Sequence, residues 1–229
     1  MKAMILAAGR GERLRPLTDE CPKPLLPVAG QPLILHTIRA LVSAGFCDLV
    51  INLAYRGAQI RAALGDGAAF GAHITYSDEG PEALETAGGI RQALPWLGDA
   101  PFLVVNGDIA TDFPFARLRS RLADGDDAHL VLIDNPPHHP DGDFGLSATG
   151  RVRDETVGAR LTFSGIGVYR PEWVRTWPLG KQKLAPLLRQ AIVENFISGE
   201  HYRGAWHDIG DVDRYRAAQS FLDSIGIGA

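Results

Sequence analysis

The sequence contains few of the residues that mark several common protein classes. Its 229 residues include only two cysteines, Cys21 and Cys47, and their spacing indicates neither a zinc site nor a disulfide framework. No apolar run approaches the roughly 20 residues that a membrane-spanning helix needs. Met1 leads into a short apolar strand and not into a cationic leader followed by an apolar segment. We therefore expect a cytoplasmic protein of a reducing compartment, without membrane contact.

Other absences argue against several kinds of ligand binding and catalysis. The net charge of −4 argues against general nucleic-acid binding. No arrangement of Ser, His and Asp or of Cys and His indicates nucleophilic catalysis. The first glycines are not followed by the Gly-Lys-Ser/Thr of a P-loop, and Leu14 stands where a dinucleotide fingerprint needs a third glycine. Adjacent His138 and His139 lie in a Pro/Gly-rich loop and point apart, so we assign them no metal site and no role.

Strands and helices alternate along the first half of the chain, which predicts an α/β fold with a mostly parallel sheet covered by helices on both faces. After residue 134, short strands indicate a smaller mixed or antiparallel region. A chain that is 45% hydrophobic can bury a substantial core, and nothing divides it, so we expect one domain over 1–229, with halves of about 1–110 and 111–229. The expected strands are 2–7, 48–53, 73–76, 102–106, 129–133, 145–148 and 165–169, and the expected helices are 33–44, 58–64, 86–94 (ended by Pro95), 115–122, 184–195 and 212–225.

The strongest motif lies at the first strand, where the apolar run Met4–Ala7 opens into a loop with glycines at 9 and 11. Glycine lets the backbone approach a ligand closely, with N–H groups free to bind phosphate oxygens. Cationic side chains follow on or just after the loop: Arg10, Arg13, Arg15 and Lys23. This combination suits a polyanion, most plausibly a nucleoside triphosphate. The alternative is a basic surface turn after a strand.

Val104-Val-Asn-Gly-Asp108 carries the second motif. A buried strand ends here, Gly107 permits a tight turn, and Asp108 arrives at the carboxyl edge of the sheet, where open parallel sheets bind ligands. A carboxylate there can hold Mg²⁺, which takes oxygen ligands and substrate phosphates. The alternative is a turn aspartate.

Together with Trp206-His-Asp208-Ile-Gly210, these motifs resemble the signature of the sugar-1-phosphate nucleotidyltransferases, over nearly the whole chain. The resemblance implies a Rossmann-like fold and catalytic roles for Arg13 and Lys23. It also implies that Asp108 and Asp208 hold Mg²⁺, whereas Asp211 suits the N-cap of the last helix. The nucleotide-binding residues it implies are Leu6, Ala7, Ala8, Gly9, Arg10, Gly11, Thr86, Gly88 and Asn106.

The chain departs from the family pattern in three places. Glu85 stands where many members have glycine in the turn that recognises the base. The family's Glu-Lys-Pro is replaced by Arg153-Asp-Glu155-Thr, with no lysine between residues 24 and 180, and its Asn-Ala-Gly becomes Phe163-Ser-Gly165. At the positions that correspond to the family's sugar-binding residues, the resemblance implies Gly145, Glu155 and Gly165. It leaves Arg153, Arg160 and Arg170 as unranked candidates for the cation at the acceptor phosphate. Arg203 joins them as a candidate for contact with a carboxylate on the sugar.

The expected reaction is Mg²⁺-dependent: a nucleoside triphosphate and a sugar 1-phosphate give a nucleotide sugar and pyrophosphate. The compact size and the Leu-Glu-Thr and Phe-Ser-Gly variants are most similar to bacterial members that use UTP and N-acetylmuramate 1-phosphate in peptidoglycan recycling. Mannose-1-phosphate guanylyl transfer, glucose-1-phosphate nucleotidyl transfer and a nucleotide-sugar-sensing regulatory module remain alternatives. We expect a monomer or small homo-oligomer whose partners are these substrates, without nucleic acid or membrane.

Overall fold

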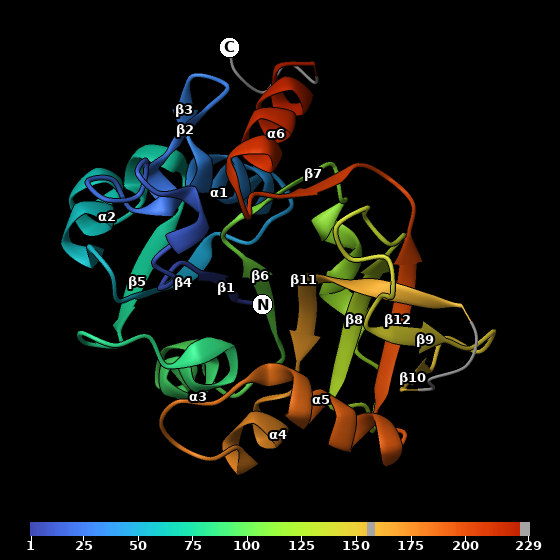
Figure 1. Ribbon diagram of the computed structural model, residues 1–229. Coiled ribbons are helices and arrows are strands. Elements are labelled where there is room, and N and C mark those ends of the chain that lie inside the picture. Colours follow the sequence, from blue (N-terminus) through green and yellow to red (C-terminus); the bar gives the residue numbers. More distant parts are fainter. Residues whose placement is uncertain (155–158, 225–229) are drawn as a thin grey trace.

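A sheet of nine strands lies at the centre of the computed structural model, which describes residues 1–154 and 159–224 (Figure 1). Its order is β10-β9-β11-β6-β1-β4-β5, and β8 pairs with both β11 and β12. The strands are β1 (Ala3–Leu6), β4 (Asp48–Leu53), β5 (His73–Asp78), β6 (Phe102–Asn106), β8 (Ala128–Ile133), β9 (Phe144–Leu146), β10 (Val152–Arg153), β11 (Arg160–Tyr169) and β12 (Ile197–Tyr202). The expected α/β class is confirmed: a central, mostly parallel sheet is flanked by helices.

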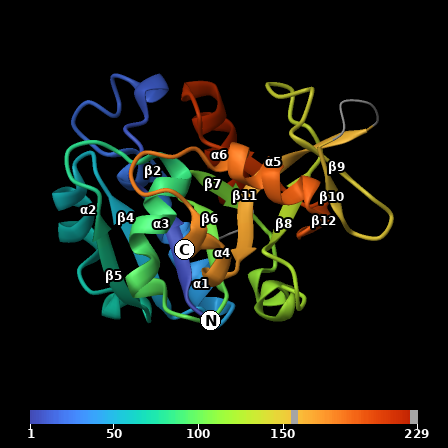
Figure 2. The ribbon, with the colours of Figure 1, turned by 90° about the horizontal axis from the view of Figure 1, so that it is seen from below.

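Both faces of the sheet are covered because alternate side chains of its strands point to opposite sides. Ile5 and Ile51 pack on the side of α1 and α2, whereas Met4 and Val50 pack on the side of α3, α4 and α5. Figure 2 looks onto α3, α4 and α5 from below. The helices are α1 (Leu33–Ser43), α2 (Gly57–Leu64), α3 (Glu85–Leu97), α4 (Pro171–Thr176), α5 (Leu184–Val193) and α6 (Val212–Ser224). Burial on both faces explains why these strands are continuous apolar runs in the sequence.

The two halves of the chain share the sheet. β11 runs antiparallel between β6 and β8, and its Ile166 lies opposite both Val105 and Val131. β8 and β12 are parallel. β9 pairs with Arg160 and Leu161 at the start of β11, and β10 pairs with β9. Since one sheet runs through both halves, we propose that the chain folds as a single unit.

A small ribbon returns the C-terminal segment to the carboxyl end of β6. β7 (Ile109–Thr111) pairs antiparallel with β13 (Trp206–Asp208), and α6 follows directly. α6 packs with Leu14, Leu33 and other residues of the N-terminal segment, which also contains the short strands β2 (Pro27–Val28) and β3 (Gln31–Pro32). The predicted N-cap is confirmed, because Asp211 Oδ1 accepts a hydrogen bond from the Arg214 N–H at 3.0 Å.

Two expected helices were wrong in detail. α3 does not end before Pro95 but continues to Leu97, because the burial of Leu94 and Leu97 outweighs the one hydrogen bond that proline cannot donate near a helix end. The segment Phe115–Ser120 is a 3-10 helix, whose three residues per turn place Phe115 and Leu118 on the same buried side. In the described part of the chain, no helix is long and apolar enough to cross a membrane.

Candidate functional site

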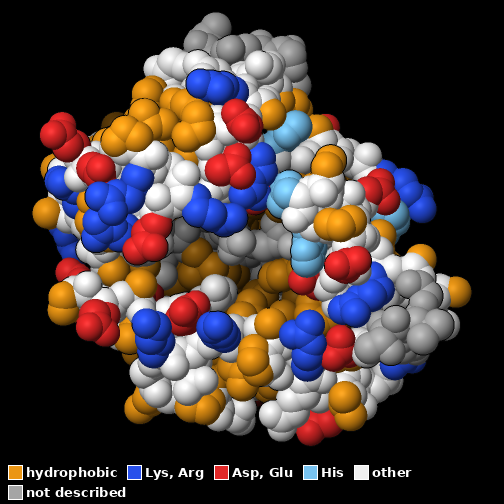
Figure 3. All heavy atoms as spheres, in the orientation of Figure 1, with side chains coloured by type: hydrophobic (Ala, Val, Ile, Leu, Met, Phe, Trp, Pro, Cys, Tyr) orange, Lys and Arg blue, Asp and Glu red, His pale blue; other side chains and the backbone are white. Residues whose placement is uncertain are grey.

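A cavity of about 660 Å³ opens where β1, β4 and β6 end. Leu6 lies opposite Asn52 on one side and Asn106 on the other, so the three strands end at the same level. Figure 3 shows the molecule from the same side as Figure 1, with a hollow near the centre that has an apolar floor and charged side chains around its rim. Ligands of open α/β sheets bind at this edge, and nine of the predicted site residues line the cavity: Leu6, Ala7, Ala8, Gly9, Arg10, Lys23, Thr86, Asn106 and Asp108.

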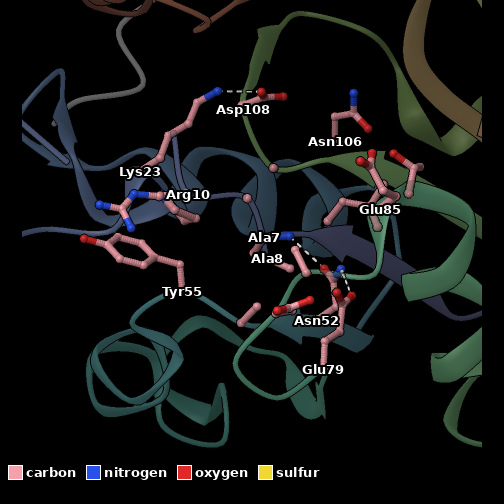
Figure 4. Close-up of a pocket in the computed structure, with 18 of the residues that line it drawn as sticks. Ala7, Ala8, Arg10, Lys23, Asn52, Tyr55, Glu79, Glu85, Asn106 and Asp108 are labelled. Carbon is pink, nitrogen blue, oxygen red and sulfur yellow. Dashed lines mark hydrogen bonds and ion pairs between the residues drawn. The ribbon is translucent and has the colours of Figure 1, made fainter. Parts of the chain in front are cut away.

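The glycine loop forms one wall of the cavity. Residues 6–10 line it directly, and Gly11 follows with a left-handed φ of +69°. Arg10 lies over the ring of Tyr55, with its guanidinium carbon 4.9 Å from the ring centre (Figure 4). Arg13, in the 3-10 helix Glu12–Leu14, is exposed and does not line this cavity, so its catalytic role stays a prediction.

Lys23 and Asp108 form an ion pair at the cavity, with 2.5 Å between Nζ and Oδ2 (Figure 4). Lys23 opens the short 3-10 helix Lys23–Leu25 and is preceded by Pro22, whose fixed φ limits where the chain can carry the lysine. The Lys23 side chain is 12% exposed and that of Asp108 is 39% exposed. The sequence motifs had placed these residues in one site, and the structure brings them into contact.

Asp208 reaches the same edge of the sheet through β13. It lies opposite Ile109 in the β7–β13 ribbon, and the Ile209 N–H donates to the Asp108 carbonyl at 2.8 Å. The Asp208 carboxylate forms an ion pair with Arg214 through Oδ2. Its Oδ1 is buried and accepts no hydrogen bond from the described residues.

These two carboxylates fit a divalent cation. Asp108 lies in the turn before β7 and Asp208 lies in β13, opposite Ile109. Each carboxylate is balanced by a cationic side chain, and the buried Oδ1 of Asp208 accepts no hydrogen bond from the residues that the structure describes. Carboxylate oxygens are the ligands that Mg²⁺ prefers, and this ion usually completes its shell with water and phosphate. In the described part of the chain, no group of three or more His, Cys, Asp or Glu is suited to a metal, so substrate oxygens would have to complete the shell.

His138 lies beside this acidic pair, although the sequence had indicated no role for it. Its Nε2 is 3.0 Å from Asp208 Oδ1, and the two atoms form no hydrogen bond. His139 instead contacts Asp143 within its own loop, at 3.2 Å. The two rings thus contact different carboxylates, as expected of side chains that point apart. No local pattern predicts this proximity, because His138 lies in the loop after β8 and Asp208 lies in β13.

A hydrogen-bonded network lies at the base of the cavity (Figure 4). Asn52 Oδ1 accepts from the Ala7 N–H at 2.7 Å, and Asn52 Nδ2 donates to Glu79 Oε1 at 2.6 Å. Glu79 Oε2 accepts from the Leu84 N–H at 2.6 Å. Burial raises the pKa of Glu79 above its ordinary value, although hydrogen bonds from Leu84 and Asn52 act in the opposite direction.

The start of α3 forms the wall opposite the glycine loop. Glu85, at the position where many family members have glycine, adopts a left-handed φ of +62° and lines the cavity beside Thr86. α3 begins at Glu85, and Leu84 is its N-cap residue. Gly88 does not line the cavity: its N–H donates to the Gln182 carbonyl at 3.2 Å, and a Cβ there would overlap the carbonyl oxygen of Gly180. This packing brings the 180–182 segment, and with it Lys181, to the cavity.

The two described residues that were expected to bind the sugar, Gly145 and Gly165, do not line the cavity. Gly145 pairs with Arg153 and Arg160 in the sheet, and Gly165 packs so closely on the Asn106 side chain that a Cβ would overlap it. Glu155 lies outside the described residues. Of the candidate arginines, Arg153 donates to Asn195, Arg160 to Asp143 and Arg170 to Asp126 and Ala123, and Arg203 is exposed; none of them lines the cavity.

Sequence reasoning missed several residues that line this cavity, among them Asn52, Tyr55, Glu79 and Lys181. Asn52 and Glu79 carried a usable signal, because each is a polar residue at the carboxyl end of an expected parallel strand. Lys181 had none, since only the packing of its loop against α3 places it here.

Comparison with known proteins places these features in a family context. The sequence pattern of the family described as nucleotidyl transferase matches residues 2–159. A protein of Neisseria meningitidis serogroup B named N-acetylmuramate alpha-1-phosphate uridylyltransferase is 55% identical over 225 residues, which cover 96% of this chain and 97% of that protein. A protein of the same name from Caulobacter vibrioides is 37% identical over 232 residues, covering 96% of each.

A solved structure shares the fold. A Bacillus anthracis protein in complex with sucrose superimposes with a TM-score of 0.86, covering 100% of this chain and 98% of its own. At 21% identity this likeness concerns the fold alone. The matched segment 2–159 contains the glycine loop, Lys23 and Asp108, whereas Asp208 lies beyond it.

Proposed function

This chain belongs to the nucleotidyl transferase family, and from that premise we propose that it is a sugar-1-phosphate uridylyltransferase. It transfers the uridylyl group of UTP to N-acetylmuramate 1-phosphate and releases pyrophosphate. The reaction class is supported by one arrangement: a glycine loop and the Lys23–Asp108 pair line the same cavity, beside the strand that carries Asp208. The substrates are supported by the names of the Neisseria and Caulobacter relatives.

The proposed reaction needs no general base. The acceptor phosphate is mostly a dianion at neutral pH, because its second pKa is about 6. One of its oxygens attacks the α-phosphorus of UTP in line; as that P–O bond forms, the bond to the bridging oxygen of the β-phosphate breaks and pyrophosphate leaves with the electron pair. Catalysis then consists of aligning two anions and neutralising the charge that develops on the leaving group.

Each element of the site has a task in this proposal. Backbone N–H groups of the glycine loop bind the triphosphate, and Lys23 and Arg13 neutralise the departing pyrophosphate. Thr86 and the start of α3 face the nucleoside. Asp108 and Asp208 hold Mg²⁺, which when bound supplies positive charge at the reacting phosphate. We place this reaction in the cytoplasm, a reducing compartment, which agrees with two cysteines that are both free. We also assign it to peptidoglycan recycling.

A substrate panel tests the proposal. N-acetylmuramate 1-phosphate carries a lactyl carboxylate that N-acetylglucosamine 1-phosphate lacks, and a buried donor left unpaired by the smaller sugar costs about 1–3 kcal/mol. At about 1.4 kcal/mol per factor of ten, we expect kcat/KM to favour the muramate sugar by about ten- to a hundredfold. The measurement is pyrophosphate release with each sugar and with UTP, GTP, CTP or dTTP.

Equal kcat/KM values for the two sugars, or a preference for the neutral one, would contradict the muramate assignment and leave the transfer chemistry intact. Fastest turnover with GTP and mannose 1-phosphate would replace the assignment by a guanylyl transfer. Failure to release pyrophosphate with every pair would contradict the enzyme proposal itself.

Lys181 is the cation that we assign to the acceptor phosphate, in place of the lysine that the family pattern has and this chain lacks. It lines the cavity, is exposed, and has no ion-pair partner in the described part of the chain. Replacing Lys181 by alanine should lower kcat/KM for either sugar by about tenfold, the effect of one charged hydrogen bond. Lys183→Ala is the matched control, because Lys183 is exposed two residues away and does not line the cavity. A rise confined to the KM for UTP would instead assign Lys181 to the nucleotide.

A further inference from the structure

The Asn52–Glu79 network joins the two walls of the cavity, and this arrangement carries an inference that rests on the proposed nucleotide site. We propose that Asn52 and Glu79 are positioning residues, which fix the spacing between the glycine loop at Ala7 and the start of α3 at Leu84. Through that spacing they set the affinity for the nucleotide, which spans both walls. Their side chains act through the hydrogen bonds that they make to the protein.

The geometry of the network supports this role. Asn52 is 3% exposed and lies between β1 and β5, opposite Leu6 on one side and Ser77 on the other. Its amide oxygen binds the first N–H of the glycine loop, and its amide nitrogen binds Glu79. Glu79 follows β5 directly and binds the N–H of Leu84, the residue before α3. A continuous chain of three hydrogen bonds therefore runs from one wall to the other.

Each residue type in the chain of hydrogen bonds follows from the donors it meets. The Ala7 N–H requires an acceptor, so the amide of Asn52 must turn its oxygen toward Ala7 and its NH₂ group toward Glu79. Glu79 then faces two donors, Asn52 Nδ2 and the Leu84 N–H, with one oxygen for each. Only a carboxylate offers two acceptor oxygens here, since a glutamine would offer one acceptor and one donor.

α3 is shaped to accommodate the pair. A Cβ at Gly89 would lie 2.9 Å from Asn52 Nδ2 and would overlap Glu79 Oε1, so only glycine lets the helix pack this closely on both side chains. Glycine inside a helix is about 1 kcal/mol less favourable than alanine. The close approach of Asn52 and Glu79 explains why a glycine stands at position 89, in the first turns of α3. The two side chains therefore contact the body of α3 and also hold the residue that precedes it.

A swap of the two functional groups tests the proposal. In Asn52→Asp, two carboxylates face each other; in Glu79→Gln, one amide oxygen must serve two donors. In the double variant Asn52→Asp/Glu79→Gln, the introduced carboxylate can accept from the Ala7 N–H and from the introduced amide, whose oxygen accepts from the Leu84 N–H. The double variant therefore restores all three hydrogen bonds and the net charge of the pair.

The readouts are the affinity for UTP, measured by calorimetry without acceptor, and the hydrogen exchange of the Ala7 amide. We expect each single variant to weaken UTP binding by about tenfold and the double variant to recover most of that loss. Asp78→Asn is the matched control, because it removes a neighbouring exposed carboxylate that does not line the cavity; it should bind UTP as the wild type does.

Several outcomes would overturn the proposal. If the folded double variant binds UTP as weakly as Glu79→Gln, the charge of Glu79 itself contacts the nucleotide. Unchanged affinity in both single variants would equally exclude a positioning role. Glu79→Gln must also speed exchange at Ala7, to which Glu79 is connected only through Asn52, and unchanged exchange would refute the proposal even without nucleotide. Failure of the wild type to bind UTP while the exchange coupling is present would contradict the proposed function and not this inference.

Discussion

Asp108→Asn and Asp208→Asn should each lower turnover by about 10²–10³-fold, the loss measured when one preorganised electrostatic element is removed from an active site. An amide keeps the shape of the side chain but removes the negative charge that a divalent cation requires. The fold should survive both changes, because Asp108 is 39% exposed and the β7–β13 pairing uses only backbone groups. Turnover measured across a Mg²⁺ titration, with the thermal midpoint as a check on folding, is the deciding experiment.

The control for Asp208 is Asp211→Asn. Both carboxylates pair with Arg214, so the control reproduces the loss of a charged partner for that arginine without changing the predicted metal site. Asparagine also remains a good N-cap for α6. If Asp208→Asn behaved like Asp211→Asn, or if either predicted ligand variant kept near wild-type turnover at limiting Mg²⁺, the metal role of that residue would be wrong.

Lys23→Ala should lower kcat by about 10²-fold with a smaller change in the KM for UTP, as expected for a group that stabilises charge mainly in the transition state. Pyrophosphate gains negative charge as it leaves, and the Lys23 ammonium is held at the cavity with only 12% of its side chain exposed. Steady-state kinetics with varied UTP separate the two parameters. Lys183→Ala again controls for the loss of a lysine elsewhere on the chain.

Because Lys23 is paired with Asp108, the Mg²⁺ dependence of the Lys23→Ala variant tests a second possible role for the lysine. If Lys23 served only to balance Asp108, its removal would change the Mg²⁺ dependence of the reaction and leave kcat at saturating Mg²⁺ near the wild-type value. An increase confined to the KM for UTP would mean that Lys23 binds the ground state only. Either result would remove Lys23 from the group of residues that stabilise the leaving pyrophosphate.

The parallel half of the fold was predictable from the sequence because its strands are short apolar runs buried on both faces, separated by amphipathic helices. The strands 48–53 and 102–106 were predicted with the bounds that the structure has. The ribbon β7–β13 was not predicted, because each of its strands has three residues and is stabilised by a partner far away in the chain. The end of α3 was misplaced for a related reason, since buried contacts beyond Pro95 override the local preference to stop.

The sequence by itself determined the parts of the site that follow a strand directly: the glycine loop after β1, and Asp108 in the turn after β6. A strand end and its first turn are local, so composition and order are enough to place them at one edge of the sheet. Only the tertiary structure decided which distant groups join them. Lys181 reaches the cavity because Gln182 pairs with the start of α3, and Asp208 lies beside Asp108 because β13 pairs with β7. Such contacts depend on pairings between segments far apart in the chain, whose partners no local pattern of residues specifies.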